Sequence, residues 1–131
     1  MDTLILNDNS LQGQIPVQIC NAVQLETLEM TYNALDGPIP ACIGQLSELE
    51  YFFVSNNALT GPLPVAISTL VKLKGIVVDD NFLSGDVVSL FNSLPDLALL
   101  FLEDNDFEGT ITDEFLAGQM ELVQLDISTN K

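Results

Sequence analysis

The sequence predicts an α/β solenoid, in which similar coils stack one on another and their strands pair into a parallel β-sheet on the concave face. Three observations predict this fold: a regularly spaced asparagine, a fixed frame of apolar residues before it, and a glycine after it. The asparagines are separated by 24, 24, 24, 24 and 25 residues and are Asn9, Asn33, Asn57, Asn81, Asn105 and Asn130. The repeat covers essentially the whole chain, so we expect a single domain over residues 1–131 with about five to six repeats.

The apolar frame before each asparagine predicts a short β-strand. Apolar residues lie eight, five and three positions before it, as Leu49, Phe52 and Val54 do before Asn57. Alternate side chains of a strand point to opposite faces, so the frame faces the core and the positions between its members face solvent. Residues 24 apart in successive coils are therefore expected to stand side by side in the sheet.

The residues after each asparagine predict a turn and then an extended stretch. In the third repeat Leu59, Gly61 and Leu63 follow Asn57 at plus two, four and six, and the other repeats have equivalent residues. Glycine suits a position with a tight turn or a positive φ. Proline follows in three repeats, as Pro16, Pro40 and Pro64, and Val88 and Thr112 replace it in the next two. We expect the stacked asparagine amides to satisfy backbone groups in the turn and one another.

The consensus LxxLxLxxNxLxGxIPxxIxxLxxL resembles the plant-specific class of leucine-rich repeat, found in receptor-kinase ectodomains, receptor-like proteins and polygalacturonase-inhibiting proteins. The resemblance implies a right-handed coil stack with short 3-10 or irregular helical segments on the convex side. It also implies an extracellular or cell-surface location. The extra residue of the last repeat falls between Phe115 and Leu122, where we expect a surface bulge. Neither end carries a polar capping segment, so we expect a fragment of a longer protein that lacks both caps.

The charge of the chain limits its partners. Nineteen acidic residues face three lysines, with no arginine and no histidine, and the net charge is −16 at pH 7. Such a surface repels nucleic acid and anionic membranes and attracts basic partners or cations. No apolar run in the sequence approaches the roughly 18 residues of a membrane span. We therefore expect no nucleic-acid partner and no direct membrane insertion of this segment; solubility alone is the other explanation of the charge.

The solvent-facing positions of the strands, six, four, two and one before each asparagine, form four columns across the coils. In coils three to five the first two columns give an apolar patch, defined as Tyr51, Phe53, Val77, Leu99 and Phe101. The other two columns give an acidic strip, defined as Asp79, Asp80, Glu103 and Asp104.

An exposed cluster of aromatic side chains on a concave face is typical of a contact surface. Carboxylates beside it suit a protein or peptide with a hydrophobic anchor and neighbouring lysine or arginine. We therefore predict a non-enzymatic protein- or peptide-recognition module. The other interpretations are that a flanking domain covers the patch, or that its aromatic side chains pack over neighbouring coils.

Other functions have weaker support in the sequence. Without histidine, and without a loop that interrupts the repeats, we expect neither catalysis nor a cofactor. The acidic strip together with Asp106 could attract calcium, although no segment has the EF-hand spacing. A structural or cation-binding extracellular module is therefore the second hypothesis. Ice binding calls for uniform threonine or asparagine columns, and the columns here are mixed.

The two cysteines, Cys20 and Cys42, lie in adjacent coils but two positions out of register, eleven after Asn9 and nine after Asn33. Their spacing matches no zinc or redox motif. A disulfide between neighbouring coils is sterically conceivable, but we favour two unpaired thiols buried as small apolar side chains.

Overall fold

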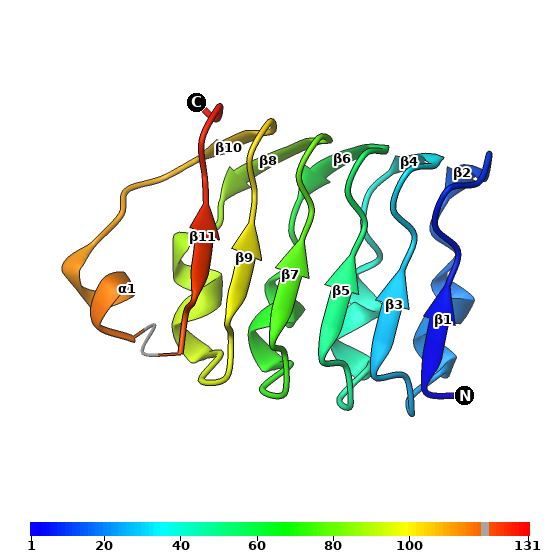
Figure 1. Cartoon of the computed structure of the whole chain (residues 1–131), viewed down its shortest axis with the longest axis horizontal. Helices are drawn as coiled ribbons and strands as arrows, with labels where there is room; N and C mark the ends of the chain where they lie inside the picture. Colours follow the sequence, from blue (N-terminus) through cyan, green and yellow to red (C-terminus); the bar gives the residue numbers. More distant parts are fainter. Residues whose placement is uncertain (119–120) are drawn as a thin grey trace.

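A computed structural model describes residues 1–118 and 121–131 and shows a single row of stacked coils (Figure 1). Their first strands pair in parallel in the order β1-β3-β5-β7-β9-β11. These strands are β1 (Thr3–Ile5), β3 (Thr27–Glu29), β5 (Tyr51–Phe53), β7 (Gly75–Val77), β9 (Leu99–Phe101) and β11 (Gln124–Asp126). The predicted leucine-rich-repeat solenoid is confirmed.

The register of this sheet agrees with the 24-residue repeat. Phe53 in β5 pairs with Val77 in β7, and Val77 pairs with Phe101 in β9. Tyr51, Gly75 and Leu99 form the parallel row two residues earlier. Residues 24 apart are thus lateral neighbours, which is the condition that any surface built from the columns requires.

A second parallel sheet, which the sequence analysis did not predict, follows the asparagines in the order β10-β8-β6-β4-β2. Its strands are β2 (Gln12–Gln14), β4 (Ala34–Gly37), β6 (Ala58–Pro62), β8 (Phe82–Asp86) and β10 (Asp106–Glu108). The predicted positive φ of the glycines is present, for example 77° at Gly61 and 89° at Gly85. Glycine and proline are depleted in strands, so this segment resembled a turn in the sequence although it pairs in register.

Helical segments lie on the side opposite the six-stranded sheet (Figure 1). Within the described residues, four of them are 3-10 helices, η1 (Val17–Asn21), η2 (Ala41–Gln45), η3 (Val65–Thr69) and η4 (Val88–Ser93). The prolines predicted to hold an extended backbone directly precede η1, η2 and η3; Pro40, for example, has φ −60° and ψ 132°.

The last coil has an α-helix instead, α1 (Asp113–Gly118), and the hydroxyl of Thr112 accepts a hydrogen bond from the Phe115 N–H at 3.1 Å. Thr112 thereby satisfies a backbone donor of the first turn, which the prolines of earlier coils do not do. The predicted surface bulge falls partly on residues 119–120, outside the described residues.

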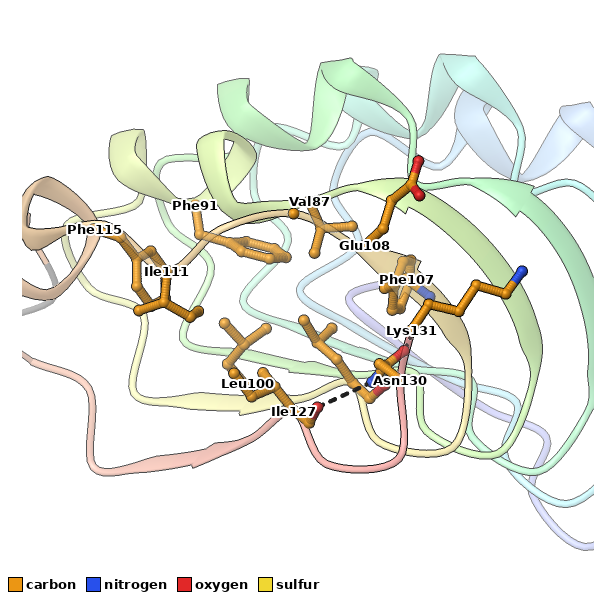
Figure 2. Close-up of a pocket in the computed structure, with 12 residues that line it drawn as sticks. Val87, Phe91, Leu100, Phe107, Glu108, Ile111, Phe115, Ile127, Asn130 and Lys131 are labelled. Carbon is orange, nitrogen blue, oxygen red and sulfur yellow. Dashed lines mark hydrogen bonds between the residues drawn. The ribbon is translucent and has the colours of Figure 1, made fainter.

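The core lies between the six-stranded sheet and the helices. Phe52, Ile76 and Leu100, the central residues of their strands, are almost completely buried, as the alternating pattern predicts. A cavity of about 110 Å³ remains near the last coils, where Phe91 from η4 and Phe115 from α1 approach Leu100 from β9 (Figure 2). The cavity is lined mainly by apolar side chains behind the sheet and is not part of its outward face.

The ladder asparagines bind backbone atoms of two coils. The Asn81 amide donates to the carbonyl oxygens of Val78 and Asp79 in its own coil and of Val54 in the preceding coil, at 3.0–3.1 Å. Its side-chain oxygen accepts the Leu59 N–H at 3.0 Å. The same contacts recur at Asn33, Asn57, Asn105 and Asn130. In the described residues the amides bond to backbone and not to one another, so that part of the prediction is wrong.

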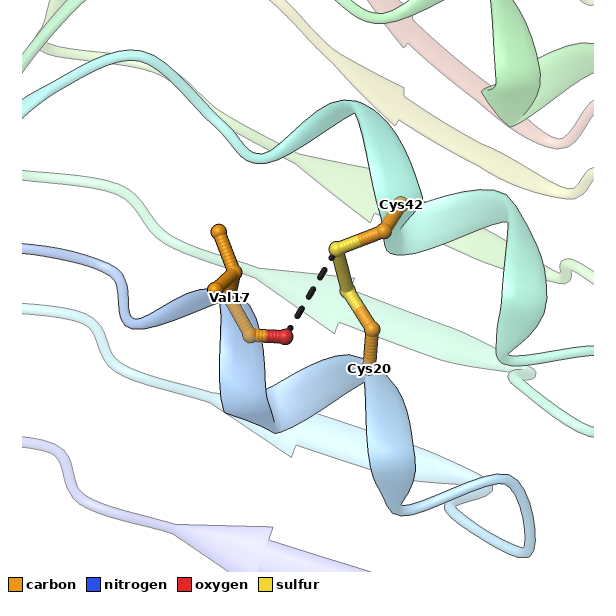
Figure 3. The surroundings of a disulfide bond; sticks show 3 residues. All are labelled: Val17, Cys20 and Cys42. Carbon is orange, nitrogen blue, oxygen red and sulfur yellow. Dashed lines mark hydrogen bonds between the residues drawn. A yellow bond between two sulfur atoms is a disulfide. The ribbon is translucent and has the colours of Figure 1, made fainter.

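Cys20 and Cys42 form a disulfide that joins η1 to η2 (Figure 3), with their Cα atoms 5.9 Å apart. The Val17 carbonyl oxygen lies beside the bridge, 3.6 Å from Cys42 Sγ. The preference for two unpaired thiols is therefore wrong. Relative to their asparagines, the two cysteines differ by two positions in the repeat. Because they lie on adjacent 3-10 helices, this difference still leaves their Cα atoms at an ordinary disulfide distance.

Candidate recognition surface

The apolar patch lies on the outward face of β5, β7 and β9. Its five residues are all half-buried and alternate with fully buried neighbours in the same strands. The register places Phe53, Val77 and Phe101 in one row and Tyr51 and Leu99 in the next. The structure thus brings together all five residues that the columns selected.

Two aromatic rings of the patch pack against each other and over a glycine. The ring centroids of Tyr51 and Phe53 are 5.8 Å apart in an edge-to-face arrangement. A Cβ atom added to Gly75 would lie 3.0 Å from Phe53 Cε1 and 3.1 Å from Tyr51 Cδ1. The rings therefore lean toward the next coil, and they remain partly exposed. Gly75 makes this position possible, because any side chain there would meet them.

The acidic strip lies beyond the ends of β7 and β9 and not within them, because these strands are only three residues long. Asp80 and Asp104 are exposed and both have a left-handed backbone with φ 51°. Aspartate tolerates this conformation better than most residues, since its short side chain bonds locally. The strip therefore follows the apolar patch along the chain direction, at the carboxyl ends of the strands.

Glu103 differs from the exposed aspartates of the strip. Its Oε2 atom is buried and has no hydrogen-bond partner within the described residues. Burial raises the pKa of this carboxyl, and the negative charges of Asp79, Asp126 and Asp104 raise it further, against a lowering by a backbone hydrogen bond. Asp79 instead accepts a hydrogen bond from the Ser55 hydroxyl of the preceding coil.

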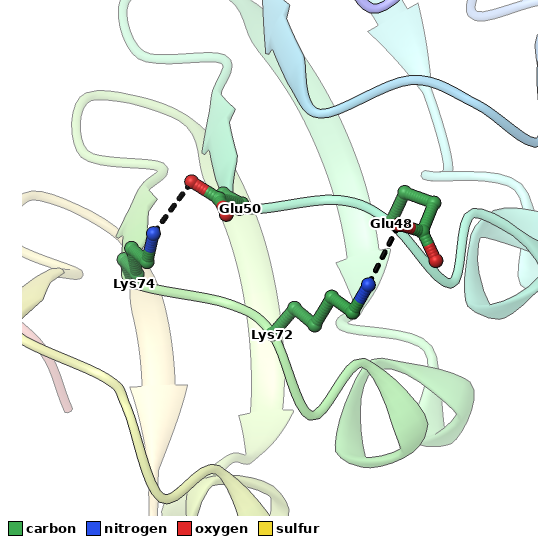
Figure 4. A network of polar contacts seen from close by, with 4 residues as sticks. All are labelled: Glu48, Glu50, Lys72 and Lys74. Atoms are coloured by element: carbon green, nitrogen blue, oxygen red, sulfur yellow. Dashed lines mark hydrogen bonds and ion pairs between the residues drawn. The ribbon is translucent and has the colours of Figure 1, made fainter.

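Each lysine of the chain is in an ion pair. Lys72 pairs with Glu48 at 2.6 Å and Lys74 with Glu50 at 2.7 Å (Figure 4). The hydrogen bond that each lysine donates to its glutamate raises the pKa of that lysine. Lys131 pairs with Asp106 at 3.2 Å. Most acids on this molecule are therefore not neutralised by a lysine, and its surface is strongly negative.

A shallow groove of about 310 Å³ borders the apolar patch at the start of the strands. Its lining is Tyr51, Lys74, Asp96, Ala98, Leu99, Glu121 and Val123. Sequence reasoning identified only Tyr51 and Leu99 of this set. The other residues precede the strands, at seven and nine positions before the asparagines, and so lie outside the four solvent-facing columns.

The acidic side chains in the described part of the chain do not form a recognisable metal centre. Among residues 1–118 and 121–131, no group of three or more histidine, cysteine, aspartate or glutamate side chains is placed to hold a metal ion. In the same part of the chain, no helix has the length and apolar character to cross a membrane.

Known proteins share both the repeat and the fold. A family model described as Leucine Rich Repeat matches residues 24–46 and 48–70. The ectodomain of the Arabidopsis thaliana receptor kinase GASSHO1/SCHENGEN3, in complex with CASPARIAN STRIP INTEGRITY FACTOR 2, has a TM-score of 0.94 and 33% identity over 99% of this chain and 16% of its own. The plant peptide hormone receptor RGFR1, in complex with RGF2, has a TM-score of 0.95 and 31% identity over 99% of this chain and 21% of its own.

A plant ice-binding protein also superposes, with a TM-score of 0.90 and 27% identity over 100% of this chain and 42% of its own. A comparison with curated protein sequences gives no significant match.

The paired sheets, the asparagine ladder and these similarities define a leucine-rich-repeat solenoid. In its repeat and its fold the chain is a plant-type leucine-rich-repeat solenoid, and plant receptor-kinase ectodomains are among its structural neighbours. It spans about a sixth to a fifth of the two receptor ectodomains.

Proposed function

We propose that the chain is a non-enzymatic module that recognises a protein or peptide segment on the outward face of its six-stranded sheet. The observation that carries the proposal is the apolar patch, whose side chains remain partly exposed on three adjacent strands. Two structurally similar ectodomains support it, since each was solved in complex with a partner and one is described as a peptide hormone receptor.

The geometry favours an extended segment that crosses β5, β7 and β9. An apolar side chain of the segment would cover Phe53, Val77 and Phe101 and remove their exposed surface from water. A lysine or arginine beside that anchor would meet Asp80 and Asp104, which are exposed. Such charge complementarity mainly accelerates association and excludes acidic partners.

We also propose an extracellular or cell-surface location. The Cys20–Cys42 disulfide supports it independently of the similar ectodomains, because disulfides form and persist mainly in oxidising compartments.

A random-peptide display selection on the wild-type protein tests the proposed site. Peptides selected for binding should lose about 1–2 orders of magnitude in affinity for the variant Phe53→Ser/Phe101→Ser, since two central apolar contacts disappear. The matched control is Val17→Ser/Val65→Ser, which removes two exposed apolar side chains from the starts of η1 and η3. Selected peptides that bind both variants equally would contradict the proposal, provided that both melt cooperatively like the wild type.

The second hypothesis, a structural or cation-binding module, has a separate test. Calcium titration followed by thermal melting should leave the Tm unchanged at constant ionic strength if the module binds peptides alone. A saturable rise in Tm would favour a cation site, because a ligand of the folded state stabilises it.

A further inference from the structure

The groove at the start of the strands has features of a side-chain pocket. It runs along the same outward face as the apolar patch, beside Tyr51 and Leu99, and continues to Val123 next to β11. Val123 is 79% exposed, although it is a β-branched apolar residue on the sheet side of the molecule. Exposed apolar surface that continues a proposed contact area points to a longer contact.

One small lining residue, Ala98, deepens the groove. Ala98 lies between Lys74 and Val123, since its N–H donates to the Lys74 oxygen and its carbonyl accepts the Val123 N–H, both at 2.8 Å. Gly75 does not line the groove, because aromatic rings of the apolar patch cover that glycine. Larger side chains of the neighbouring coils line the groove around Ala98.

The charge of the groove is negative. Lys74 lines the groove, and its ammonium is paired at 2.7 Å with Glu50, which is not a lining residue. Asp96 and Glu121 are exposed, and neither has an ion-pair partner among the described residues. The groove therefore combines an apolar floor, one aromatic ring, two carboxylates and one lysine, and the charge of this lysine is already offset by Glu50.

We propose that this groove holds a lysine or arginine side chain of the bound segment. The aliphatic stem would lie on Leu99 and Val123, and the cationic head would reach Asp96 and Glu121 beside the Tyr51 ring. Long cationic side chains bury their stems on apolar surface while the head stays with water or carboxylates, and aromatic rings add attraction for cations. The inference rests on the proposed function for the source of the side chain. It places a cationic contact at the opposite end of the apolar patch from the acidic strip.

An NMR titration of the isotope-labelled chain tests the groove directly. The probe is Nα-acetyl-arginine N-methylamide, and Nα-acetyl-citrulline N-methylamide is the uncharged analogue of the same shape. The arginine probe should shift the amide signals of Ala98, Leu99 and Val123 with a saturable curve, and the citrulline probe should bind at least about tenfold more weakly because it lacks the charge-assisted contacts.

Two variants with the same change in net charge complete the experiment. Asp96→Asn/Glu121→Gln should abolish the saturable shifts, whereas Asp36→Asn/Glu108→Gln, on the second sheet, should keep them. Equal weakening by both variants would overturn the proposal, since it would show general attraction by the net charge. Saturable shifts centred on the acidic strip would overturn it as well.

The outcome is separable from the test of the proposed function. If display-selected peptides depend on Phe53 and Phe101 but the arginine probe leaves Ala98, Leu99 and Val123 unshifted, only the groove inference fails. If the probe binds in the groove but no selected peptide depends on the two phenylalanines, the proposed function fails and the cationic groove stands.

Discussion

Single residues of the acidic strip experience different environments. Glu103 has a buried carboxylate oxygen without a hydrogen-bond partner in the described chain, and burial is the main reason that its pKa is raised. A raised pKa in the folded state means that folding favours the protonated form. Its contribution to stability is present below the ordinary glutamate pKa and is lost as the pH rises through the raised value.

The variant Glu103→Gln should therefore have a higher Tm than the wild type near neutral pH, because the neutral amide has nearly the shape of the carboxyl group and carries no charge that burial would penalise. The difference should shrink on acidification and vanish below a pH of about 4, where the wild-type carboxyl is protonated in both states. Thermal melting of both proteins over a pH series measures this difference in Tm. Asp36→Asn controls for the loss of one negative charge at an exposed site. A neutral-pH Tm no higher than that of the control would contradict the role of burial.

The asparagine ladder gives a second prediction at this scale. Asn81 is 6% exposed and makes four hydrogen bonds to backbone. Among the described residues, the exposed Asn9 makes two, which it donates to the carbonyl oxygens of Leu6 and Asn7. Removal of the Asn81 amide takes away four hydrogen bonds and leaves the buried Leu59 N–H without its acceptor. We therefore expect Asn81→Ala to cost about 2–4 kcal/mol and Asn9→Ala about 1 kcal/mol or less. Urea unfolding of both variants measures the difference. Equal losses would contradict the buried ladder.

At the scale of elements, the disulfide joins two 3-10 helices of neighbouring coils. The cysteines are 22 residues apart in sequence, so the bridge limits the freedom of the unfolded chain over this loop. The variant Cys20→Ser/Cys42→Ser should lose about 2–4 kcal/mol of stability. A reductant should lower the Tm of the wild type and leave that of the double variant unchanged. A wild-type Tm insensitive to complete reduction would contradict the structural role of the bridge.

The sequence predicts some elements and not others, for physical reasons. The inner strands follow from alternation, since Phe52 and Ile76 must be buried for the stack to form a core. The second sheet did not follow, because a positive-φ glycine such as Gly61 and a nearby proline resemble a turn. The disulfide did not follow either, because a count along the repeat does not measure the distance across two helices.

The candidate surface, too, could be predicted from the sequence only in part. The apolar patch follows from the columns, because the register equals the repeat and Phe53, Val77 and Phe101 must then be neighbours. The groove depends on the tilt of the Tyr51 ring over Gly75 and on residues that precede the strands. These features arise from side-chain packing between coils, which cannot be derived from a single sequence.

At the scale of the whole molecule, the net charge of −16 opposes compaction. Only three lysines offset the acids, and all three are in ion pairs. Salt screens repulsion between exposed charges over about 10 Å at 0.1 M, so the Tm should rise as NaCl increases. Calcium chloride at the same ionic strength should give a similar rise. A Tm that is independent of NaCl would contradict the importance of self-repulsion.

The central claim is that Phe53, Val77 and Phe101 form one outward row that contacts a ligand. The most direct measurement is NMR of the chain with labelled methyl and aromatic groups during titration with a display-selected peptide. The account predicts that the side-chain signals of these three residues shift together and saturate at one peptide concentration. Shifts confined to the 3-10 helices or to the second sheet, with the row unaffected, would contradict it.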